Sequence, residues 1–198
     1  MQDKRRHQRI RFSSPPPIAI GYGGATGKGG IENLSLSGLM LRTDLALEVG
    51  HRAGCEFSLF GSARIDLPAV VVNRLADLYG LRFEPGPISQ ILLEDAIAAA
   101  LAEGHASSLS MHQVGGQKVM RIVGALNGTL QNDVIYSLTR VGVDEIDVSG
   151  VTAVDRAGLE LCLLAQGRHS VRVGQQSECF AKAWADFLQM PRTPGDGL

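Results

Sequence analysis

Five cationic side chains lie within the first eleven residues of the chain, and Asp3 is the acidic residue among them. They are Lys4, Arg5, Arg6, Arg9 and Arg11. Guanidinium groups pair bidentately with phosphates, match the O6/N7 edge of guanine and stack on flat bases. A guanine nucleotide with several phosphates would therefore satisfy this cluster. Taken alone, a basic run at a chain terminus is more often a solvated leader.

A second polar element is the segment Asn33-Leu34-Ser35-Leu36-Ser37-Gly38, which lies inside a strand pattern. The short amide and hydroxyl groups of Asn33 and Ser35 can make hydrogen bonds, and Gly38 lets a ligand or another backbone approach closely. These are the groups that a polar pocket on the wall of a barrel needs. Taken alone, an edge strand that ends in a turn would account for the same residues.

Together the two elements resemble the PilZ domain. Arg5-Arg6-His7-Gln8-Arg9 looks like the RxxxR element of that family, and the segment from Asn33 to Gly38 matches its [D/N]xSxxG element, in the expected order and at a typical separation. Two later segments, Ala69–Arg74 and Tyr79–Phe83, are similar to the late strands of that barrel. The resemblance covers about residues 4–86, and a following helix is also common in the family.

The resemblance implies a receptor, because PilZ domains are six-stranded barrels that bind the bacterial second messenger cyclic di-GMP. Arg5 and Arg9 would hold phosphates and guanine edges from an N-terminal arm, residues 1–12, and Asn33, Ser35 and Gly38 would form the barrel-side wall. The complete candidate set is Lys4, Arg5, Arg6, Arg9, Asn33, Ser35 and Gly38. Lys4 gives the arm more positive charge than one ligand with two phosphates needs, which favours an intercalated pair of ligand molecules over one.

The first 86 residues are predicted to form a small antiparallel barrel, since short runs rich in Val, Leu, Ile and Phe alternate with Gly, Asp or Pro. The expected strands are Ile18–Tyr22, Ile31–Arg42, Gly54–Phe60, Ser62–Pro68, Ala69–Leu75 and Leu78–Phe83, with Gly23–Gly30 as a turn. A helix is expected from Pro87 to Glu103, with Gly104 as its stop signal. Its apolar positions at turn spacing include Ile88, Ile91, Leu92 and Ala96.

The second half alternates strands and helices, which predicts a small α/β sandwich. The expected strands are Leu109–Val114, Lys118–Gly124, Asp144–Ser149 and Ser170–Gly174, and the expected helices are Leu130–Val141, Ala157–Gly167 and Glu178–Leu188. The apolar stripe Phe180, Trp184, Phe187 and Leu188 should dock the last helix on the sheet. We therefore expect a first domain over residues 1–104, a second over 105–190 and a tail over 191–198.

The second domain also resembles a family. The run from Glu145 to Leu159 looks like the central strand, loop and helix start of STAS domains, the fold of anti-sigma-factor antagonists, and the resemblance covers about residues 109–190. It implies a domain that contacts a partner protein. In that family a Ser or Thr directly after the loop aspartate is often the phosphorylated switch. Here Arg156 follows Asp155, so phosphorylation at that position is unavailable, and Asp155 is expected to be a helix N-cap.

Other classes of function are disfavoured by the sequence. The five histidines have no metal-ligand spacing, no Gly-x-Ser-x-Gly elbow is present, and Gly27-Lys28 lacks the flanking residues of a phosphate-binding loop. A net charge of -1 argues against a general nucleic-acid binder. We therefore expect no catalytic residue, metal, cofactor or membrane span, and a cytoplasmic location. Cys55, Cys162 and Cys179 are interpreted as small buried hydrophobic residues.

The sequence therefore predicts a bacterial signalling protein in which cyclic di-GMP binding by the first domain controls contact between the second domain and a protein partner. The main alternative is a nucleotide-independent scaffold, or an interaction protein of the anti-sigma-antagonist type, whose PilZ domain does not bind the nucleotide. An enzyme that hydrolyses a nucleotide is disfavoured, because no credible base, nucleophile or metal cluster is present. The oligomeric state and the partner stay open.

Overall fold

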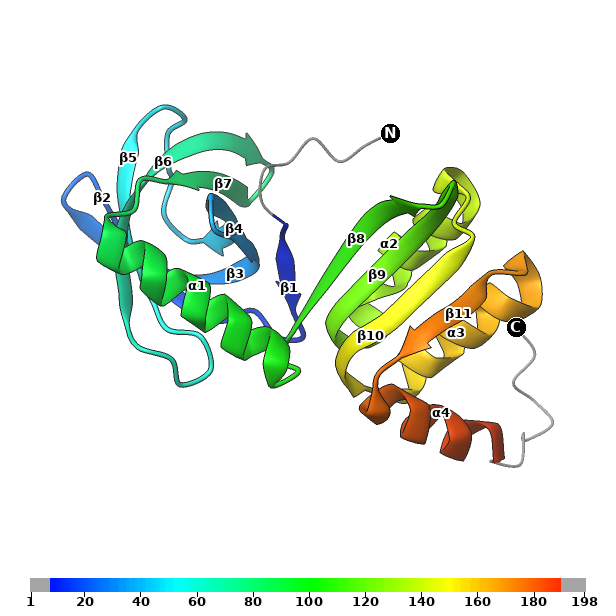
Figure 1. The fold of residues 1–198 in the computed structure, drawn as a ribbon. Coiled ribbons are helices and arrows are strands. Elements are labelled where there is room, and N and C mark those ends of the chain that lie inside the picture. Colours follow the sequence, from blue (N-terminus) through cyan, green and yellow to red (C-terminus); the bar gives the residue numbers. More distant parts are fainter. Residues whose placement is uncertain (1–7, 190–198) are drawn as a thin grey trace. The chain divides into compact units, whose positions relative to one another are not determined.

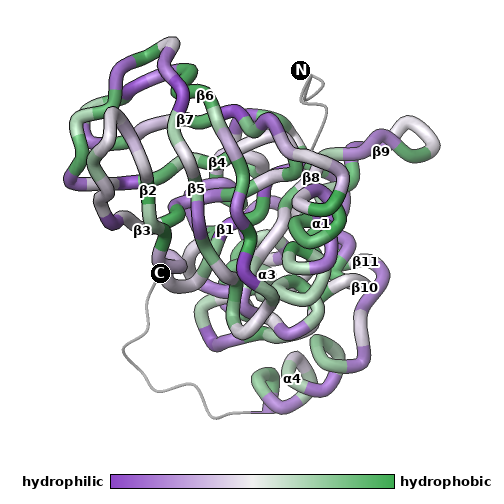
Figure 2. The backbone as a smooth tube through the Cα atoms, turned by 90° about the vertical axis from the view of Figure 1, so that its left-hand side faces the viewer, coloured by the Kyte–Doolittle hydropathy of each residue, from purple (hydrophilic) through white to green (hydrophobic). Residues whose placement is uncertain are grey.

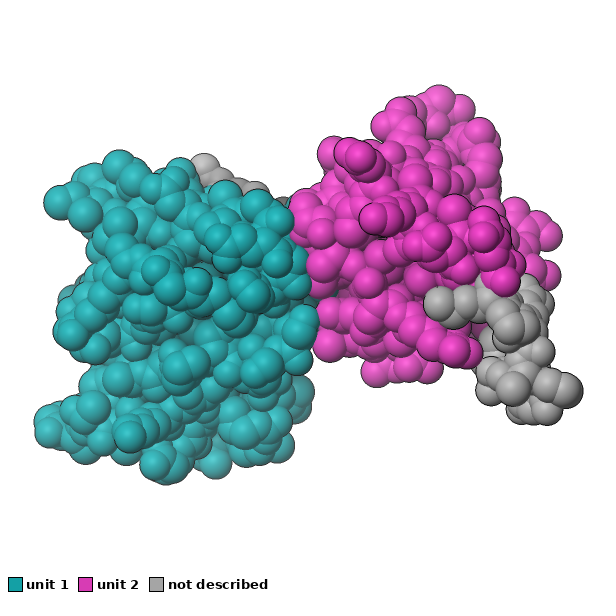
Figure 3. Space-filling view, turned by 90° about the horizontal axis from the view of Figure 1, so that it is seen from below, with its two compact units in different colours: residues 1–110 teal, residues 111–198 magenta. Residues whose placement is uncertain are grey.

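The computed structural model describes residues 8–189 of the chain. It divides into two compact units, residues 1–110 and 111–198, which are coloured separately in Figure 3. The boundary predicted from the sequence lies after Gly104, whereas the two units meet within a strand, β8 (Ala106–Val114). Within the described residues no helix has both the length and the apolar character needed to cross a membrane.

The first unit contains a closed barrel (Figure 1). Its strands are β1 (Ile10–Phe12), β2 (Pro17–Tyr22), β3 (Ala25–Ser35), β4 (Gly38–Thr43), β5 (Arg52–Phe57), β6 (Ile65–Leu75) and β7 (Leu78–Phe83). Six of them pair antiparallel in the order β3-β2-β5-β6-β7-β4, and the pairing of β4 with β3 closes the ring. β1 pairs with Asn33 and Leu34 near the end of β3, beyond the residues that pair with β2. The predicted six-stranded antiparallel barrel is confirmed.

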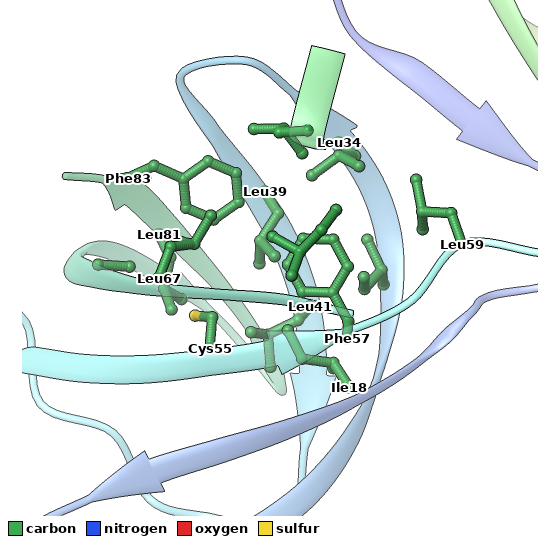
Figure 4. Close-up of a cluster of buried hydrophobic side chains, with 14 of the residues drawn as sticks. Ile18, Leu34, Leu39, Leu41, Cys55, Phe57, Leu59, Leu67, Leu81 and Phe83 are labelled. Carbon is green, nitrogen blue, oxygen red and sulfur yellow. The ribbon is translucent and has the colours of Figure 1, made fainter. Parts of the chain in front are cut away.

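Buried apolar side chains fill the barrel, and in β5 and much of β6 they alternate with exposed positions. Leu34, Leu41 and Cys55 have no exposed surface, and they point into the same core from β3, β4 and β5 (Figure 4). Burying one such leucine or isoleucine side chain contributes about 1.5–3 kcal/mol, so the aliphatic interior supplies most of the stabilisation of the barrel. This is the rigid scaffold on which the polar residues of the outer face are held.

A helix follows the barrel as predicted: α1 spans Pro87–Ala102, with Pro87 in its first turn and Glu103 as its C-cap. Leu93, Ala96 and Ala100 are its buried residues and join the barrel core. Two of the apolar positions that marked this helix in the sequence, Ile88 and Ile91, are instead 75% and 59% exposed. They lie on the opposite side of the helix from the two small alanines, which allow close approach to the barrel.

Several predicted strand boundaries in the first unit are wrong, including the strand predicted over Gly54–Phe60, which is β5 over Arg52–Phe57. The predicted turn over Gly23–Gly30 is confined to Gly23 and Gly24, which adopt positive φ angles of 58° and 82°, and the rest of that segment belongs to β3. The predicted strand over Ile31–Arg42 is two strands joined at Leu36 and Ser37. The two strands predicted on either side of Pro68 are one strand, β6, in which Pro68 is exposed and its carbonyl accepts a hydrogen bond from the Glu84 amide at 2.9 Å.

The second unit combines a sheet with helices. Its strands lie in the order β8-β9-β10-β11, with β9 (Gln117–Leu126), β10 (Glu145–Val154) and β11 (Arg172–Gln176) parallel to one another. Its helices are η1 (Gly128–Leu130), α2 (Gln131–Tyr136), η2 (Ser137–Val141), α3 (Arg156–His169) and α4 (Glu178–Gln189). β10 runs five residues beyond the predicted end at Ser149, because Gly150–Val154 continues to pair with β9.

The start of α3 follows the sequence prediction. The Asp155 side chain accepts a hydrogen bond from the Gly158 amide at 2.8 Å and so acts as the N-cap. Arg156 stands in the first turn, where its Nε lies 2.8 Å from a carboxylate oxygen of Glu160. Gly158 is required at this point, because a Cβ there would collide with the carbonyl oxygen of Leu126. The loop therefore serves the packing of α3 on β9.

The apolar stripe on α4 is only partly buried. Phe180 is completely buried, and its ring lies 5.6 Å from that of Trp184, which lies 5.9 Å from that of Phe187. Leu188 is 53% exposed, so the prediction that the whole stripe docks on the sheet is wrong for the end of the helix. Figure 2 shows hydrophobic and hydrophilic residues alternating along α4.

The three cysteines differ in environment. Cys55 and Cys162 are buried, as predicted, and burial raises the pKa of each thiol to about 12; the charge of Asp66 adds to the rise at Cys55. Cys179 is exposed, so its prediction as a buried residue is wrong: it lies in the first turn of α4 and not in the core.

Selective alkylation should reveal this difference. Alkylating reagents attack thiolates, and a thiol with a raised pKa stays protonated at pH 8. We expect iodoacetamide at pH 8 to label Cys179 in the folded protein and all three cysteines after unfolding, as read by mass spectrometry of the peptides. Equal labelling rates for Cys55 and Cys179 in the folded protein would contradict the burial of the barrel cysteine.

Candidate ligand-binding site

The hairpin between β3 and β4 brings together the predicted wall residues. Asn33 pairs in register with Met40, and Ser35 pairs with Gly38 across a turn of two residues. The Phe83 amide donates a hydrogen bond to the Ser37 carbonyl at 3.0 Å, which ties the turn to the end of β7. The residues of the [D/N]xSxxG element are therefore neighbours in space on a braced hairpin.

Asn33 contains an unsatisfied polar atom. Its Oδ1 is buried, and among the described residues it has no hydrogen-bond partner. Leaving a buried acceptor unpaired costs about 1–3 kcal/mol, and most buried polar side-chain atoms in folded proteins have partners. Such an atom at the centre of a candidate site is suited to accept a hydrogen bond from a ligand.

Ser35 has a structural role in the hairpin. It is only 2% exposed, and its Oγ donates a hydrogen bond to the Gly38 carbonyl at 3.1 Å. The same oxygen lies 3.2 Å from the Oγ of Ser37, which is exposed. Ser35 therefore fixes the shape of the hairpin, and its hydroxyl connects the buried part of the wall to the exposed hydroxyl of Ser37.

Gly38 allows β4 to approach β7 closely. A Cβ at this position would collide with the carbonyl oxygen of Leu81 and would lie 3.2 Å from the Cα of Arg82. Both contacts are with backbone atoms, which cannot rotate away as a flexible side chain could. The glycine is thus needed for the close packing of the barrel itself.

The predicted arginine arm leads directly to this wall. β1 pairs antiparallel with β3, with Ile10 opposite Leu34 and Arg11 opposite Asn33. Arg9, which precedes β1, is exposed, and its carbonyl lies 3.5 Å from the Oγ of Ser108. The structure therefore brings Arg9 near Asn33, Ser35 and Gly38, although these residues are separated by more than twenty positions in the sequence.

Three of the predicted site residues, Lys4, Arg5 and Arg6, lie outside the described residues, so their roles stay predictions. Arg11 was counted in the cationic cluster but was not assigned to the ligand, and the structure places it opposite Asn33. The sequence gives only a weak signal for this position, because β1 is three residues long and pairs with residues that lie more than twenty positions later in the chain.

The chemical groups of the candidate site are hydrogen-bonding and cationic ones. In the described part of the chain, no cluster of three or more His, Cys, Asp or Glu residues could hold a metal ion. The wall offers an amide, two hydroxyl groups and backbone atoms, and the arm offers guanidinium groups. This combination can bind an anion with hydrogen-bonding edges.

Comparison with solved structures finds similar barrels at low sequence identity. The PilZ domain of YcgR from Escherichia coli, solved with cyclic di-GMP, is 18% identical with a TM-score of 0.43, over 49% of this chain and 91% of that chain. The inhibitor of motility MotI/DgrA from Bacillus subtilis is 17% identical with a TM-score of 0.40, over 50% and 52%. PlzA from Borreliella burgdorferi, in complex with cyclic di-GMP, is 17% identical with a TM-score of 0.36, over 48% and 41%.

A search of curated proteins finds no match to the chain. The family model of the PilZ domain matches residues 3–103, a range that contains both motifs, the barrel and α1 and ends before the second unit. Since this range is half of the chain, the protein belongs to the PilZ domain family.

Proposed function

We propose that this protein is a cyclic di-GMP receptor whose first unit binds the ligand between the arginine arm and the β3–β4 hairpin. The observation that carries the proposal is the buried, unpaired Oδ1 of Asn33 beside β1, the strand that follows the RxxxR element. Guanine carries N–H donors that such an acceptor can bind. Membership of the PilZ family and the presence of both motifs support the same ligand.

The candidate residues divide into two groups by chemistry. Arg5 and Arg9, with Lys4 and Arg6, would pair with the phosphates and with guanine edges, because the ligand has two negative charges and guanidinium groups bind both features bidentately. Asn33, Ser35 and Gly38 would form the neutral wall. The charge surplus supplied by Lys4 favours an intercalated pair of ligand molecules. No catalytic residue, metal or cofactor is needed for this role.

Ser35 should contribute less to affinity than an arginine of the arm. Its hydroxyl is neutral and already donates to the Gly38 carbonyl, and a neutral hydrogen bond is worth roughly half of a charge-assisted one. We expect Ser35→Ala to weaken cyclic di-GMP binding by less than Arg5→Ala or Arg9→Ala, as measured by isothermal titration calorimetry. If Ser35→Ala has the largest effect of the three, then the wall and not the arm supplies most of the binding energy.

The second unit would carry the output. In the first unit, β1 pairs antiparallel with the start of β8, so that Phe12, Arg11 and Ile10 lie opposite Ala106, Ser107 and Ser108. β8 continues along the chain into the second unit. Ligand that holds the arm against the hairpin would stabilise β1 and, through it, the start of β8. We propose that this linkage changes how a STAS-like second unit meets a protein partner.

A ligand shifts such an equilibrium only through its different affinities for the two arrangements. A thousandfold difference supplies about 4 kcal/mol, which is sufficient for a switch. Because Arg156 occupies the position after Asp155, control would come from ligand occupancy of the barrel and not from a serine kinase that acts at this loop.

Three experiments test this function against a nucleotide-independent scaffold and a nucleotide-hydrolysing enzyme. Titration of the full chain with cyclic di-GMP tests the receptor, and incubation of ligand with pure protein should yield no product. The coupling is tested by partner capture with the wild-type full chain and with an Arg5→Ala/Arg9→Ala double variant, each with and without cyclic di-GMP. Ligand-dependent capture by the wild type alone supports coupling. Identical capture in all four samples would mean that the two units act independently.

A further inference from the structure

A row of paired residues extends the candidate wall by one strand. Ser35 on β3 pairs with Gly38 on β4, and Gly38 pairs with Arg82 on β7. Residues paired across antiparallel strands share a face of the sheet, and the face alternates along each strand. Leu81 and Phe83 on either side of Arg82 are buried in the core, whereas Arg82 is exposed. Arg82 therefore belongs to the outer face that carries the wall.

Nothing in the middle of this row blocks the arginine. Adjacent strands are about 4.8 Å apart, so two steps place the backbones of Ser35 and Arg82 roughly 10 Å from each other. Gly38, between them, has no side chain, and its backbone lies against Leu81 and Arg82. An arginine side chain can extend across a glycine of this kind and reach a molecule that lies on the hairpin.

The charge of Arg82 is not neutralised in the way that the charges of other barrel arginines are. Arg52 pairs with Glu84 at 2.8 Å, and Arg64 pairs with Glu56 at 2.7 Å. Arg74 lies over the ring of Tyr79. Among the contacts within residues 8–189, Arg82 makes no ion pair or side-chain hydrogen bond. It is thus an available guanidinium beside a wall that is otherwise neutral.

We propose that Arg82 is a further contact for cyclic di-GMP and pairs with one of its phosphates from the barrel side. The inference rests on the proposed function and adds a cation that neither sequence motif includes. Arg82 is held on a strand between two buried residues, so its backbone needs no ordering when the ligand binds. A preorganised contact of this kind retains more of its interaction energy as affinity.

The test compares Arg82→Gln, Arg82→Lys and the matched control Arg64→Gln in the full chain, by calorimetric titration with cyclic di-GMP. Removal of a charge-assisted hydrogen bond predicts affinity about 10-fold or more weaker for Arg82→Gln. Arg82→Lys should fall between this variant and the wild type, because an ammonium group keeps the charge but loses bidentate geometry. Arg64→Gln removes the same charge from another exposed site and should leave affinity unchanged.

The outcomes distinguish the proposal from the function on which it rests. Unchanged affinity in Arg82→Gln, in a protein whose wild type binds the ligand and whose Arg9→Ala variant binds it more weakly, would overturn the role of Arg82 alone. Equal weakening by Arg64→Gln would overturn it too, because the effect would then reflect overall charge. Absence of binding by the wild type would overturn both. Without ligand, the variants and the wild type should have similar melting temperatures. If Arg82→Gln does not fold, Arg82→Lys still tests the proposal.

Discussion

Substitution of Gly38 by alanine should both destabilise the barrel and abolish cyclic di-GMP binding. The new Cβ would collide with the Leu81 carbonyl, so the backbones of β4 and β7 must separate. Overpacking of this kind typically costs about 1–3 kcal/mol, and here the displaced strands carry Gly38 itself and lie beside Ser35. The expected result is a lower melting temperature together with the loss of the calorimetric binding signal.

Gly54→Ala provides the matched control. Gly54 is also a strand glycine of the barrel, in β5, but a Cβ there would meet nothing within 4 Å. This variant should keep both its stability and its ligand affinity close to those of the wild type. If Gly38→Ala proves as stable and as tight-binding as Gly54→Ala, the close approach of β4 to β7 does not shape the site.

Arg5→Ala and Arg9→Ala should each weaken cyclic di-GMP binding by at least about 2 kcal/mol, which is roughly a 30-fold loss of affinity. Each variant removes a charge-assisted contact to a ligand with two negative charges. The structure supports this for Arg9, which directly precedes the strand paired with Asn33 and Leu34. Calorimetry on the full chain measures the change.

The control for the arm is Arg64→Ala, which removes an exposed arginine that pairs with Glu56 on another part of the barrel. Exposed ion pairs contribute little to stability, so this variant should fold normally and bind as the wild type does. Wild-type affinity in both arm variants would refute the assignment of the RxxxR element. Weakening of similar size in Arg64→Ala would show a general charge effect.

Much of the barrel could be predicted from the sequence because local patterns decide it. Leu78–Phe83 is a short apolar-rich run between Asp77 and Pro85, and the structure has the same strand limits for β7. The predicted turn over Gly23–Gly30 was too long because the glycines in this run have two different structural roles. Gly23 and Gly24 form a turn through positive φ angles. Gly29, in the same run, lies in β3, where glycine is needed because a Cβ would collide with the Arg42 carbonyl. Composition alone does not distinguish these two uses.

Prediction of the site was limited by pairing between distant strands. Asn33, Ser35 and Gly38 are close in sequence and form one hairpin, so a short motif was sufficient to select them as candidates. Arg11 and Arg82 reach the same region only through the pairing of β1 with β3 and of β7 with β4. Which residues of two distant strands lie opposite each other depends on how the whole barrel closes, and no local pattern in a single sequence predicts it.

The receptor proposal is tested most directly by calorimetric titration of the full chain with cyclic di-GMP, in parallel with the Arg5→Ala/Arg9→Ala double variant. A receptor of the proposed design gives saturable binding, with about two ligand molecules per chain if they bind as an intercalated pair, and loses that binding in the double variant. Absence of any binding by the wild-type chain, or equal binding by the double variant, would contradict it.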